Sequence, residues 1–178
     1  MNKIFVTSDL HFSHGNILKY ENRPFLGIEH MNEQLIKRWN NVVSKHDKVF
    51  VLGDVSFANK EETKKLVSQL NGKKILIMGN HDRGRSIDFW RYVGFDEVSK
   101  YPIILYEHVV MSHEPPTYFN DATPYAYLYG HVHSTEAYKT ITKDSACVCT
   151  ERWNYTPVEL SKVLELMSEA GEREDTEI

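Results

Sequence analysis

The sequence predicts an α/β fold, and three observations support this prediction. Short apolar runs rich in Val, Ile and Leu recur along the chain, and in its first half they alternate with segments of helical spacing. Several of these runs are continuous rather than alternating, which is typical of strands buried on both faces. The chain has 178 residues, of which 41% are hydrophobic, enough for one globular domain with a proper core. We therefore expect largely parallel strands whose carboxyl ends meet at one edge.

In the first half of the chain the pattern places strands and helices in turn. A strand at 3–8 leads into a loop at 12–28, which Pro24 interrupts. The following elements are a helix at 30–44, a strand at 49–52, a helix at 59–70 and a strand at 73–78. The helix at 30–44 is amphipathic, because its apolar residues lie three and four positions apart. Asn59 is suited to cap the next helix, and Asn71-Gly72 to end it.

In the second half of the chain the pattern predicts more strands and fewer helices than in the first. Its expected elements are a short helix at 86–92, one or two strands at 95–107, a strand at 108–112, a loop at 114–125, and strands at 126–129 and 144–150. A last helix is expected at 156–168, with Thr156 as its N-cap and Pro157 in its first turn. We expect a single domain over residues 1–168 and an acidic, disordered tail over 169–178.

Charge and composition exclude several classes of protein. The last ten residues carry the whole formal net charge of −4, so the rest of the chain is close to neutral. We therefore expect no extended surface that binds nucleic acid. No apolar run approaches the length of roughly 20 residues that crosses a bilayer, and no signal-peptide pattern opens the chain. Cys147 and Cys149 are too close in sequence for an ordinary disulfide. We expect a cytoplasmic protein that does not bind membranes. The sequence leaves its oligomeric state open.

Five of the apolar runs end in a short polar cluster of similar composition. The residues at these ends are Asp9, His11, Asp54, Asn80, His81, His113, His131 and His133. Five of the nine histidines of the chain fall in these clusters, which a random scatter of histidines would not produce. Because parallel strands deliver their carboxyl ends to one edge, we expect these side chains to lie together.

This combination of side chains predicts a metal centre. Carboxylate, amide oxygen and neutral imidazole suit Zn²⁺, Mn²⁺ or Fe, and thiolates are absent from the clusters. One tetrahedral zinc needs three or four protein ligands. Setting His81 aside leaves seven candidates, too many for one ion and suitable for two that share a bridging carboxylate. Two metal ions about 3.5–4 Å apart clamp a phosphoryl group, and their charge would recruit phosphate without a basic surface.

The same motifs resemble those of the calcineurin-like metallophosphoesterase superfamily, in order and complete. They are Asp9-Leu10-His11, Gly53-Asp54, Gly79-Asn80-His81-Asp82, His113 and Gly130-His131-Val132-His133. The resemblance implies a two-layer β-sandwich flanked by helices, in the order α/β/β/α. It implies one metal held by Asp9, His11, Asp54 and His133, and a second held by Asp54, Asn80, His113 and His131. Asp54 would bridge the two ions, and His81 would face the substrate with Asp82 orienting it.

Three further stretches resemble a small single-domain subgroup found in bacteria and phages. They are DLHFSHGNILKYENRPF, MNEQLIKRWN and RWNYTPVEL. The chain lacks the continuation that protein Ser/Thr phosphatases carry after Gly-Asp, since Val55-Ser56-Phe57 follows Asp54. The segment 146–151 departs from the Gly-Val-Asp pattern of the subgroup, without touching a predicted metal ligand.

The resemblance implies a dinuclear metal-dependent phosphoesterase that hydrolyses a phosphodiester or phosphomonoester. A metal-bridging hydroxide would attack phosphorus, and His81 would assist the leaving group. The two divalent ions are Mn, Fe, Zn or Ni, with Mn²⁺ the first choice for an assay, and the partner is a small phosphate ester or nucleotide-like substrate. Two alternatives stay open: a catalytically weak scaffold that binds a partner protein, and a nuclease acting on short single-stranded nucleic acid.

A second tier of candidates lies outside these motifs. His14 follows His11 by three residues and either contacts substrate phosphate or is solvated. Arg23, like Arg83 and Arg85, either clamps phosphate or is surface charge. Four aromatic residues either form a stacking wall or belong to the core: Tyr118, Phe119, Tyr125 and Tyr127.

Overall fold

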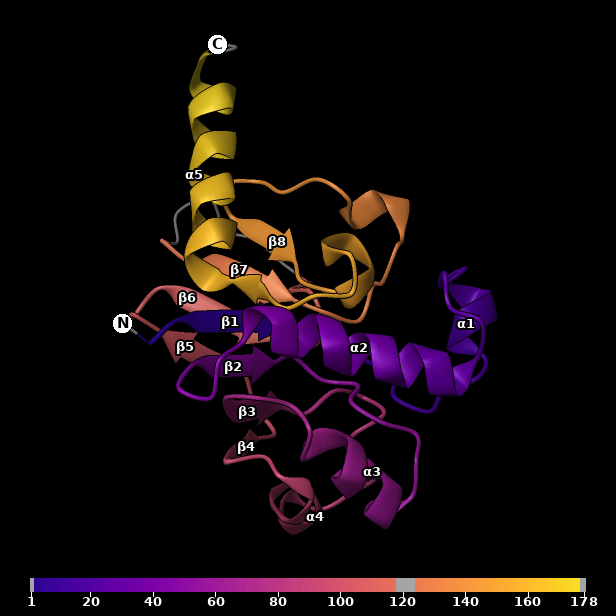
Figure 1. The fold of residues 1–178 in the computed structure, drawn as a ribbon. Helices are drawn as coiled ribbons and strands as arrows, with labels where there is room; N and C mark the ends of the chain where they lie inside the picture. The colour runs from indigo at the N-terminus through magenta and orange to yellow at the C-terminus, as the bar shows by residue number, and fades with distance from the viewer. Residues whose placement is uncertain (1, 118–123, 177–178) are drawn as a thin grey trace.

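Two β-sheets packed face to face form the centre of the molecule, and helices flank them (Figure 1). The structure is a computed structural model that describes residues 2–117 and 124–176. Tyr118 and Phe119 therefore lie outside the described residues. The sandwich and its helices confirm the predicted fold class.

The larger sheet has five strands in the order β4-β3-β2-β1-β9. Its strands are β1 (Ile4–Thr7), β2 (Lys48–Val51), β3 (Lys73–Ile77), β4 (Glu97–Ser99) and β9 (Val158–Glu159). The first four run parallel and β9 pairs antiparallel with β1. Because β1, β2 and β3 are parallel neighbours, their carboxyl ends form one continuous edge, as the sequence predicts.

Both faces of the larger sheet are buried, which explains its continuous apolar runs. On one face Val49 of β2 and Leu76 of β3 pack under α2 (Ile28–Val42), α3 (Lys60–Val67) and α4 (Ile87–Val93). On the other face Phe50 and Ile75 point into the sandwich. Trp39 of α2 and Trp90 of α4 are almost fully buried and anchor the helical layer.

The smaller sheet has four strands in the order β5-β6-β7-β8. Its strands are β5 (Ile103–Leu105), β6 (Val109–Ser112), β7 (Ala126–Tyr129) and β8 (Ser145–Cys147). β6, β7 and β8 run parallel, and β5 pairs antiparallel with β6. Met111 and Leu128 point inward and meet the larger sheet in a shared core. An isolated parallel bridge joins Ser8 to Cys149, so the two sheets are tied together where β1 and β8 end.

The last helix differs from the prediction at both ends. α5 runs over Leu160–Thr176, whereas the sequence predicted 156–168. Its expected start is occupied by the short strand β9, which forms because β1 offers it an edge, a tertiary effect that local pattern does not reveal. The helix continues past Ser168, and Ala170 is still buried. α5 contacts β1, β9 and β8 and therefore closes one edge of the sandwich.

Three short helical turns were not predicted. They are α1 (Ile17–Tyr20) within the expected loop, η1 (Glu136–Tyr138) and η2 (Thr150–Trp153). The strand expected at 144–150 is shorter: β8 covers Ser145–Cys147, and η2 begins at Thr150. Each turn is three or four residues long, too short to show a period in the sequence.

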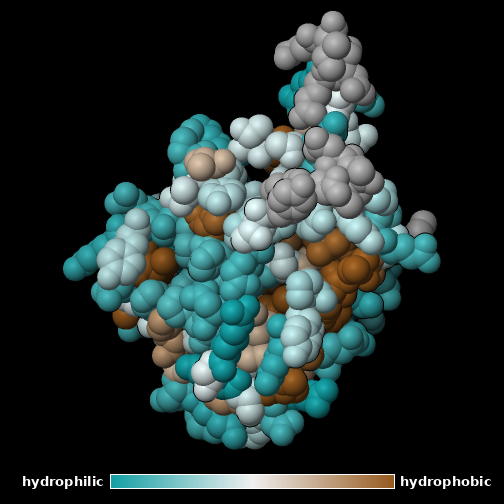
Figure 2. Space-filling view, turned by 180° about the vertical axis from the view of Figure 1, so that it is seen from behind, coloured by the Kyte–Doolittle hydropathy of each residue, from teal (hydrophilic) through white to brown (hydrophobic). Residues whose placement is uncertain are grey.

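The surface is mixed in character. The face seen in Figure 2 is largely hydrophilic with scattered hydrophobic groups. The exposed Tyr101, Ile104 and Tyr106 lie in and around β5, at the edge of the smaller sheet. None of the helices in the described part of the chain combines the length and apolarity needed to cross a bilayer.

Candidate metal centre

The structure brings the seven predicted ligands together at the carboxyl ends of five strands. Two groups of three have ligand atoms within 4.8 Å of one another: Asp9, His11 and His133 form one, and Asp54, His113 and His131 form the other. Asn80 joins the second group, with its Oδ1 2.8 Å from His113 Nε2 and 3.1 Å from His131 Nδ1. The two groups contain the ligands that the resemblance assigned to each metal.

Asp54 lies between the two groups with one carboxylate oxygen toward each. Its Oδ2 is 3.6 Å from His11 Nε2, and its Oδ1 is 3.5 Å from His113 Nε2. Two tetrahedral ligands that each lie about 2.1 Å from one zinc ion are separated by roughly 3.4 Å. Each Asp54 oxygen is therefore at a suitable distance from its neighbouring imidazole to share an ion with it. This arrangement suits a carboxylate that bridges two ions.

The ligand loops hold an uncommon backbone conformation. Five of the seven predicted ligands have φ between 45° and 71°, in the left-handed region: Asp9, His11, Asp54, His131 and His133. Non-glycine residues seldom adopt this region, and such residues gather at functional sites, where the surroundings over-determine them. The concentration of this strain on the predicted ligands is independent evidence that these loops form a site.

Glycines allow the loops to approach one another closely. A Cβ on Gly53 would lie 2.5 Å from His113 Nδ1, and one on Gly130 would lie 2.6 Å from Asp9 Oδ2. A Cβ on Gly79 would collide with the Asp54 carboxylate and lie 2.8 Å from His113 Cε1. The Gly residues in the sequence motifs therefore make space for protein ligands, not only for ions.

Three of the histidines are oriented by a second contact on their Nδ1 atom. His113 Nδ1 donates to the carbonyl of Leu52 at 2.7 Å. His133 Nδ1 lies 3.1 Å from the carboxylate of Glu151, and His11 Nδ1 lies 3.1 Å from His14 Nδ1. Such contacts fix the ring and its tautomer and leave Nε2 for a metal.

The donor atoms around Asp9 fit a cation. Asp9 Oδ2 accepts from the amide of His131 and from the thiol of Cys149. Its Oδ1 and His11 Nε2 are buried without a hydrogen-bond partner among the described residues. They lie 3.7 Å apart. Leaving buried polar atoms unpaired costs about 1–3 kcal/mol each, and a divalent ion between them would satisfy both.

The negative charge around His133 also favours a bound cation. Burial lowers the pKa of His133, but the carboxylates of Glu151 and Asp9 outweigh it and raise this pKa to about 9. Negative charges that favour a proton on this imidazole also favour a metal cation beside it. The carboxylate, amide and imidazole donors suit Mn²⁺, Fe or Zn²⁺.

His81 lies at the mouth of the centre rather than among the ligands. Its side chain is 47% exposed, and its Nε2 is 3.9 Å from Asp54 Oδ2. Its backbone amide donates to Asp54 Oδ1 at 3.0 Å, which fixes the loop that carries it. The imidazole is therefore free to meet a substrate that approaches the bridging carboxylate.

Asp82 does not orient His81 as expected. Its carboxylate accepts hydrogen bonds from the amides of Asp54 at 2.7 Å, Gly79 at 2.9 Å and Val55 at 3.1 Å. Burial raises the pKa of Asp82 to about 6, while these amide donors act in the opposite direction. Asp82 therefore braces the loops that carry Asp54 and Asn80. The sequence expectation was wrong because adjacency in sequence does not imply side-chain contact.

Arg23 lies in a different place from the one expected of a phosphate clamp. Its guanidinium is buried and donates to Glu151, to the carbonyl of Asp9 at 2.7 Å and to that of Leu10 at 2.8 Å. Arg23 thus stabilises the loop that carries Asp9 and His11 through its backbone carbonyls. No exposed donor of Arg23 is left to meet a substrate.

The other two arginines are also engaged by the protein. Arg85 donates to the carbonyls of Ser56 and Ala58, and Arg83 pairs with Glu114 at the surface. Of the three, Arg83 has the most exposed side chain, which is about half exposed.

His14 lies beside the centre, together with an aromatic residue to which the sequence analysis assigned no role. The ring of Phe57 stacks on that of His14 with centroids 3.8 Å apart and lies 4.9 Å from that of His81. Phe57 is 38% exposed. Burial and the neighbouring His11 lower the pKa of His14 to about 4. A neutral aromatic surface therefore adjoins the exposed His81.

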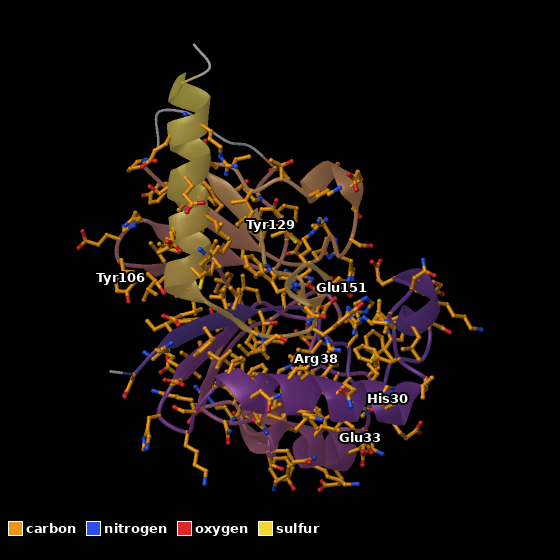
Figure 3. All side chains as sticks on the ribbon, turned by 45° about the horizontal axis from the view of Figure 1, so that its top comes forward. His30, Glu33, Arg38, Tyr106, Tyr129 and Glu151 are labelled. Carbon is orange, nitrogen blue, oxygen red and sulfur yellow. The ribbon has the colours of Figure 1, made fainter. Side chains whose placement is uncertain are left out.

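Glu151 is the other residue that sequence reasoning missed. Figure 3 shows it between Arg38 of α2 and Tyr129 at the end of β7. Its only signal in the sequence was that 146–151 departs from the pattern of the subgroup. In the structure, Glu151 of this segment contacts Nδ1 of the predicted ligand His133.

The sequence of the chain is similar to a known family and to several known proteins. The family described as calcineurin-like phosphoesterase matches residues 2–135. An uncharacterized protein of Methanocaldococcus jannaschii is 36% identical over 174 residues, covering 94% of this chain and 92% of that protein. The gene 66 protein of Mycobacterium phage L5 is 38% identical over 85 residues, covering 46% of this chain and 41% of the phage protein.

A solved structure supports the fold. A protein of unknown function from Aquifex aeolicus superposes with a TM-score of 0.68 at 21% identity, covering 93% of this chain and 100% of that one. At this identity the likeness shows the fold alone.

Proposed function

The chain belongs to the calcineurin-like phosphoesterase family, and from this premise we propose that it is a dinuclear metal-dependent hydrolase of small phosphate esters. The observation that carries the proposal is Asp54, whose two oxygens lie 3.6 Å and 3.5 Å from imidazoles of two separate ligand groups. All seven predicted ligands are present, which favours catalysis over the scaffold alternative.

Bound divalent ions would supply Lewis acidity and lower the pKa of water near phosphorus. The residues of the chain provide the rest of the mechanism. Asp54 fixes the separation of the two ligand groups, and Asp82 holds the Asp54 backbone through amide hydrogen bonds. His81 is exposed beside Asp54 and donates a proton, or a hydrogen bond, to the leaving oxygen.

The surroundings of His81 favour an aryl or nucleoside-like leaving group. Phe57 and His14 present a stacked, uncharged aromatic surface next to His81. A leaving group that His81 protonates would lie beside this surface, where an aromatic ring gains stacking energy of about 0.5–1.5 kcal/mol. This supports a nucleotide-like substrate over a purely aliphatic phosphate ester.

A substrate panel tests the proposal. The full chain, loaded with Mn²⁺, is assayed on bis-p-nitrophenyl phosphate, p-nitrophenyl phosphate, cyclic nucleotides, dinucleotides and a short single-stranded oligonucleotide. We expect turnover of at least one small ester and preference for esters with aromatic leaving groups. Failure to turn over any of them, with two metal equivalents bound, would favour the scaffold alternative. Activity on the oligonucleotide alone would favour the nuclease.

A further inference from the structure

Glu151 connects a metal ligand to a buried arginine. Its Oε1 lies 3.1 Å from His133 Nδ1 and accepts from Arg23 Nε at 3.0 Å and Nη2 at 2.5 Å. On the other side of the same imidazole, His133 Nε2 is 3.6 Å from Asp9 Oδ1. The imidazole of His133 is therefore held between a carboxylate and the position where a metal would lie.

The contacts of Arg23 extend this connection to the first ligand loop. Arg23 Nη2 also donates to the carbonyl of Asp9, and Arg23 Nη1 donates to that of Leu10. Glu151 thus joins the loop that carries His133 to the loop that carries Asp9, through a single buried ion pair. These loops are 122 or more residues apart in the chain, so the ion pair fixes a distance that local structure cannot fix.

The ion pair between Arg23 and Glu151 is almost fully buried. The side chains of Arg23 and Glu151 are 0% and 5% exposed. A buried ion pair is weak evidence for stability, because its desolvation offsets its attraction, and it is better explained by a positional role. Arg23 compensates the buried charge, so Glu151 can stay ionised and accept from the imidazole of His133.

An additional cation held by Glu21, His133 and Glu151 is the competing explanation, because their ligand atoms also lie within 4.8 Å of one another. The contacts argue against it. Glu151 Oε1 already accepts from the cationic Arg23, and Glu21 Oε2 already accepts from the hydroxyl and the amide of Ser134. The guanidinium of Arg23 already supplies the positive charge beside the Glu151 carboxylate.

We propose that Glu151 is a positioning residue that keeps the proton on His133 Nδ1 and so sets the affinity of the metal site formed by Asp9, His11, His133 and Asp54. Carboxylate–histidine–metal contacts of this kind typically contribute 10–100-fold to metal affinity. The inference rests on the proposed metal centre and requires no knowledge of the substrate.

The test compares Glu151→Gln with the matched control Glu114→Gln. Both changes remove one carboxylate charge close to the centre, but Glu114 pairs with the exposed Arg83 instead of a ligand imidazole. Metal stoichiometry and affinity are measured by titrating the metal-free full chain with Mn²⁺. We expect two sites in the wild type and the control, and in Glu151→Gln one unchanged site and one weakened by roughly 10–100-fold.

Two unaltered sites in Glu151→Gln would overturn the inference and leave the proposed function intact. A wild type that binds no metal would instead contradict the proposed function, and three wild-type equivalents would favour the additional cation. A second measurement needs no variant, in case Glu151→Gln fails to fold. Long-range ¹H–¹⁵N spectra of the zinc-loaded wild type should show a proton on His133 Nδ1. An unprotonated Nδ1 would contradict the proposal.

Discussion

At the scale of single residues, the candidate centre combines strained predicted ligands with an exposed histidine, His81. Five ligands hold φ values in the left-handed region, whereas His81, at the mouth, is not among the residues with positive φ. Backbone strain of this kind costs on the order of 1–3 kcal/mol for each residue. The hydrogen bonds of Asp82 to neighbouring amides offset part of this strain around Asp54. The predicted ligands are therefore held in an uncommon conformation, while His81 keeps an ordinary backbone conformation and an exposed side chain.

His81→Ala should retain both metal equivalents and lose turnover. Its imidazole is not placed as a ligand, so metal analysis should match the wild type. A general acid contributes roughly 10²–10⁴-fold, and we expect a loss of kcat in this range on bis-p-nitrophenyl phosphate. His46→Ala, an exposed histidine remote from the centre, is the control. Wild-type turnover in His81→Ala would show that another group serves as the acid.

Phe57→Leu should weaken the use of aromatic substrates selectively. Leucine keeps the apolar contact with His14 but removes the stacking face. From a stacking energy of about 0.5–1.5 kcal/mol we expect a roughly two- to tenfold loss in kcat/KM for aryl and nucleotide esters. Activity on an alkyl phosphate ester without an aromatic group, measured by alcohol or phosphate release, is the comparison. Equal losses on both leaving groups would argue against a stacking role.

At the scale of elements, the carboxyl ends of five strands position the predicted ligands. Each of β1, β2, β3, β6 and β7 stops just before a ligand, and glycines at Gly53, Gly79 and Gly130 let neighbouring ends touch. The spacing of the two metal groups therefore depends on how closely the strand ends pack.

Gly79→Ala should disrupt the centre, whereas Gly84→Ala should not. The new Cβ at position 79 would collide with the Asp54 carboxylate, while one at position 84 would meet no atom within 4 Å. Overpacking of this kind costs about 1–3 kcal/mol, and a surface change lies within about 0.5 kcal/mol. Urea unfolding gives the stability and metal analysis the occupancy. Two metal equivalents retained by Gly79→Ala would show that the loop yields without moving Asp54.

The sequence was a good guide to these strand ends and a poor guide to what supports them. Each ligand follows a short buried run, so a local pattern was enough to place Asp54 or His113 at an edge. Glu151 and Arg23 are 128 residues apart, and their pairing depends on how the sheets meet. β9 likewise exists only because β1 offers an edge, and Asp82 contacts amides that no spacing rule identifies. Tertiary contacts of this kind leave no periodic signal.

At the scale of the whole molecule, two sheets share the edge that carries the predicted ligands. β1, β2 and β3 deliver ligands from the larger sheet, and β6 and β7 deliver them from the smaller one. The bridge between Ser8 and Cys149 ties the sheets at this edge. The candidate metal centre therefore lies where the two sheets meet, and bound ions should hold the two sheets together.

Metal removal should accordingly lower the thermal stability of the entire fold. A ligand at 1,000 times its Kd stabilises by about 4 kcal/mol, and each kcal/mol moves the Tm of a chain this size by about 2–4 °C. We expect EDTA to lower Tm by roughly 10 °C at pH 7.5. The effect should shrink at pH 5.5, because protons compete for the imidazole ligands. Differential scanning fluorimetry measures both, and an EDTA shift that grows at pH 5.5 would contradict this account.

The most direct test of the account is the metal content of Asp54→Asn beside the wild type, measured by elemental analysis after loading with Mn²⁺ and desalting. The carboxylate of Asp54 reaches both ligand groups, so its loss should affect the pair as a unit. We predict two equivalents in the wild type and at most one in Asp54→Asn. Two equivalents retained by the variant, or a single equivalent in the wild type, would contradict a dinuclear centre bridged by Asp54.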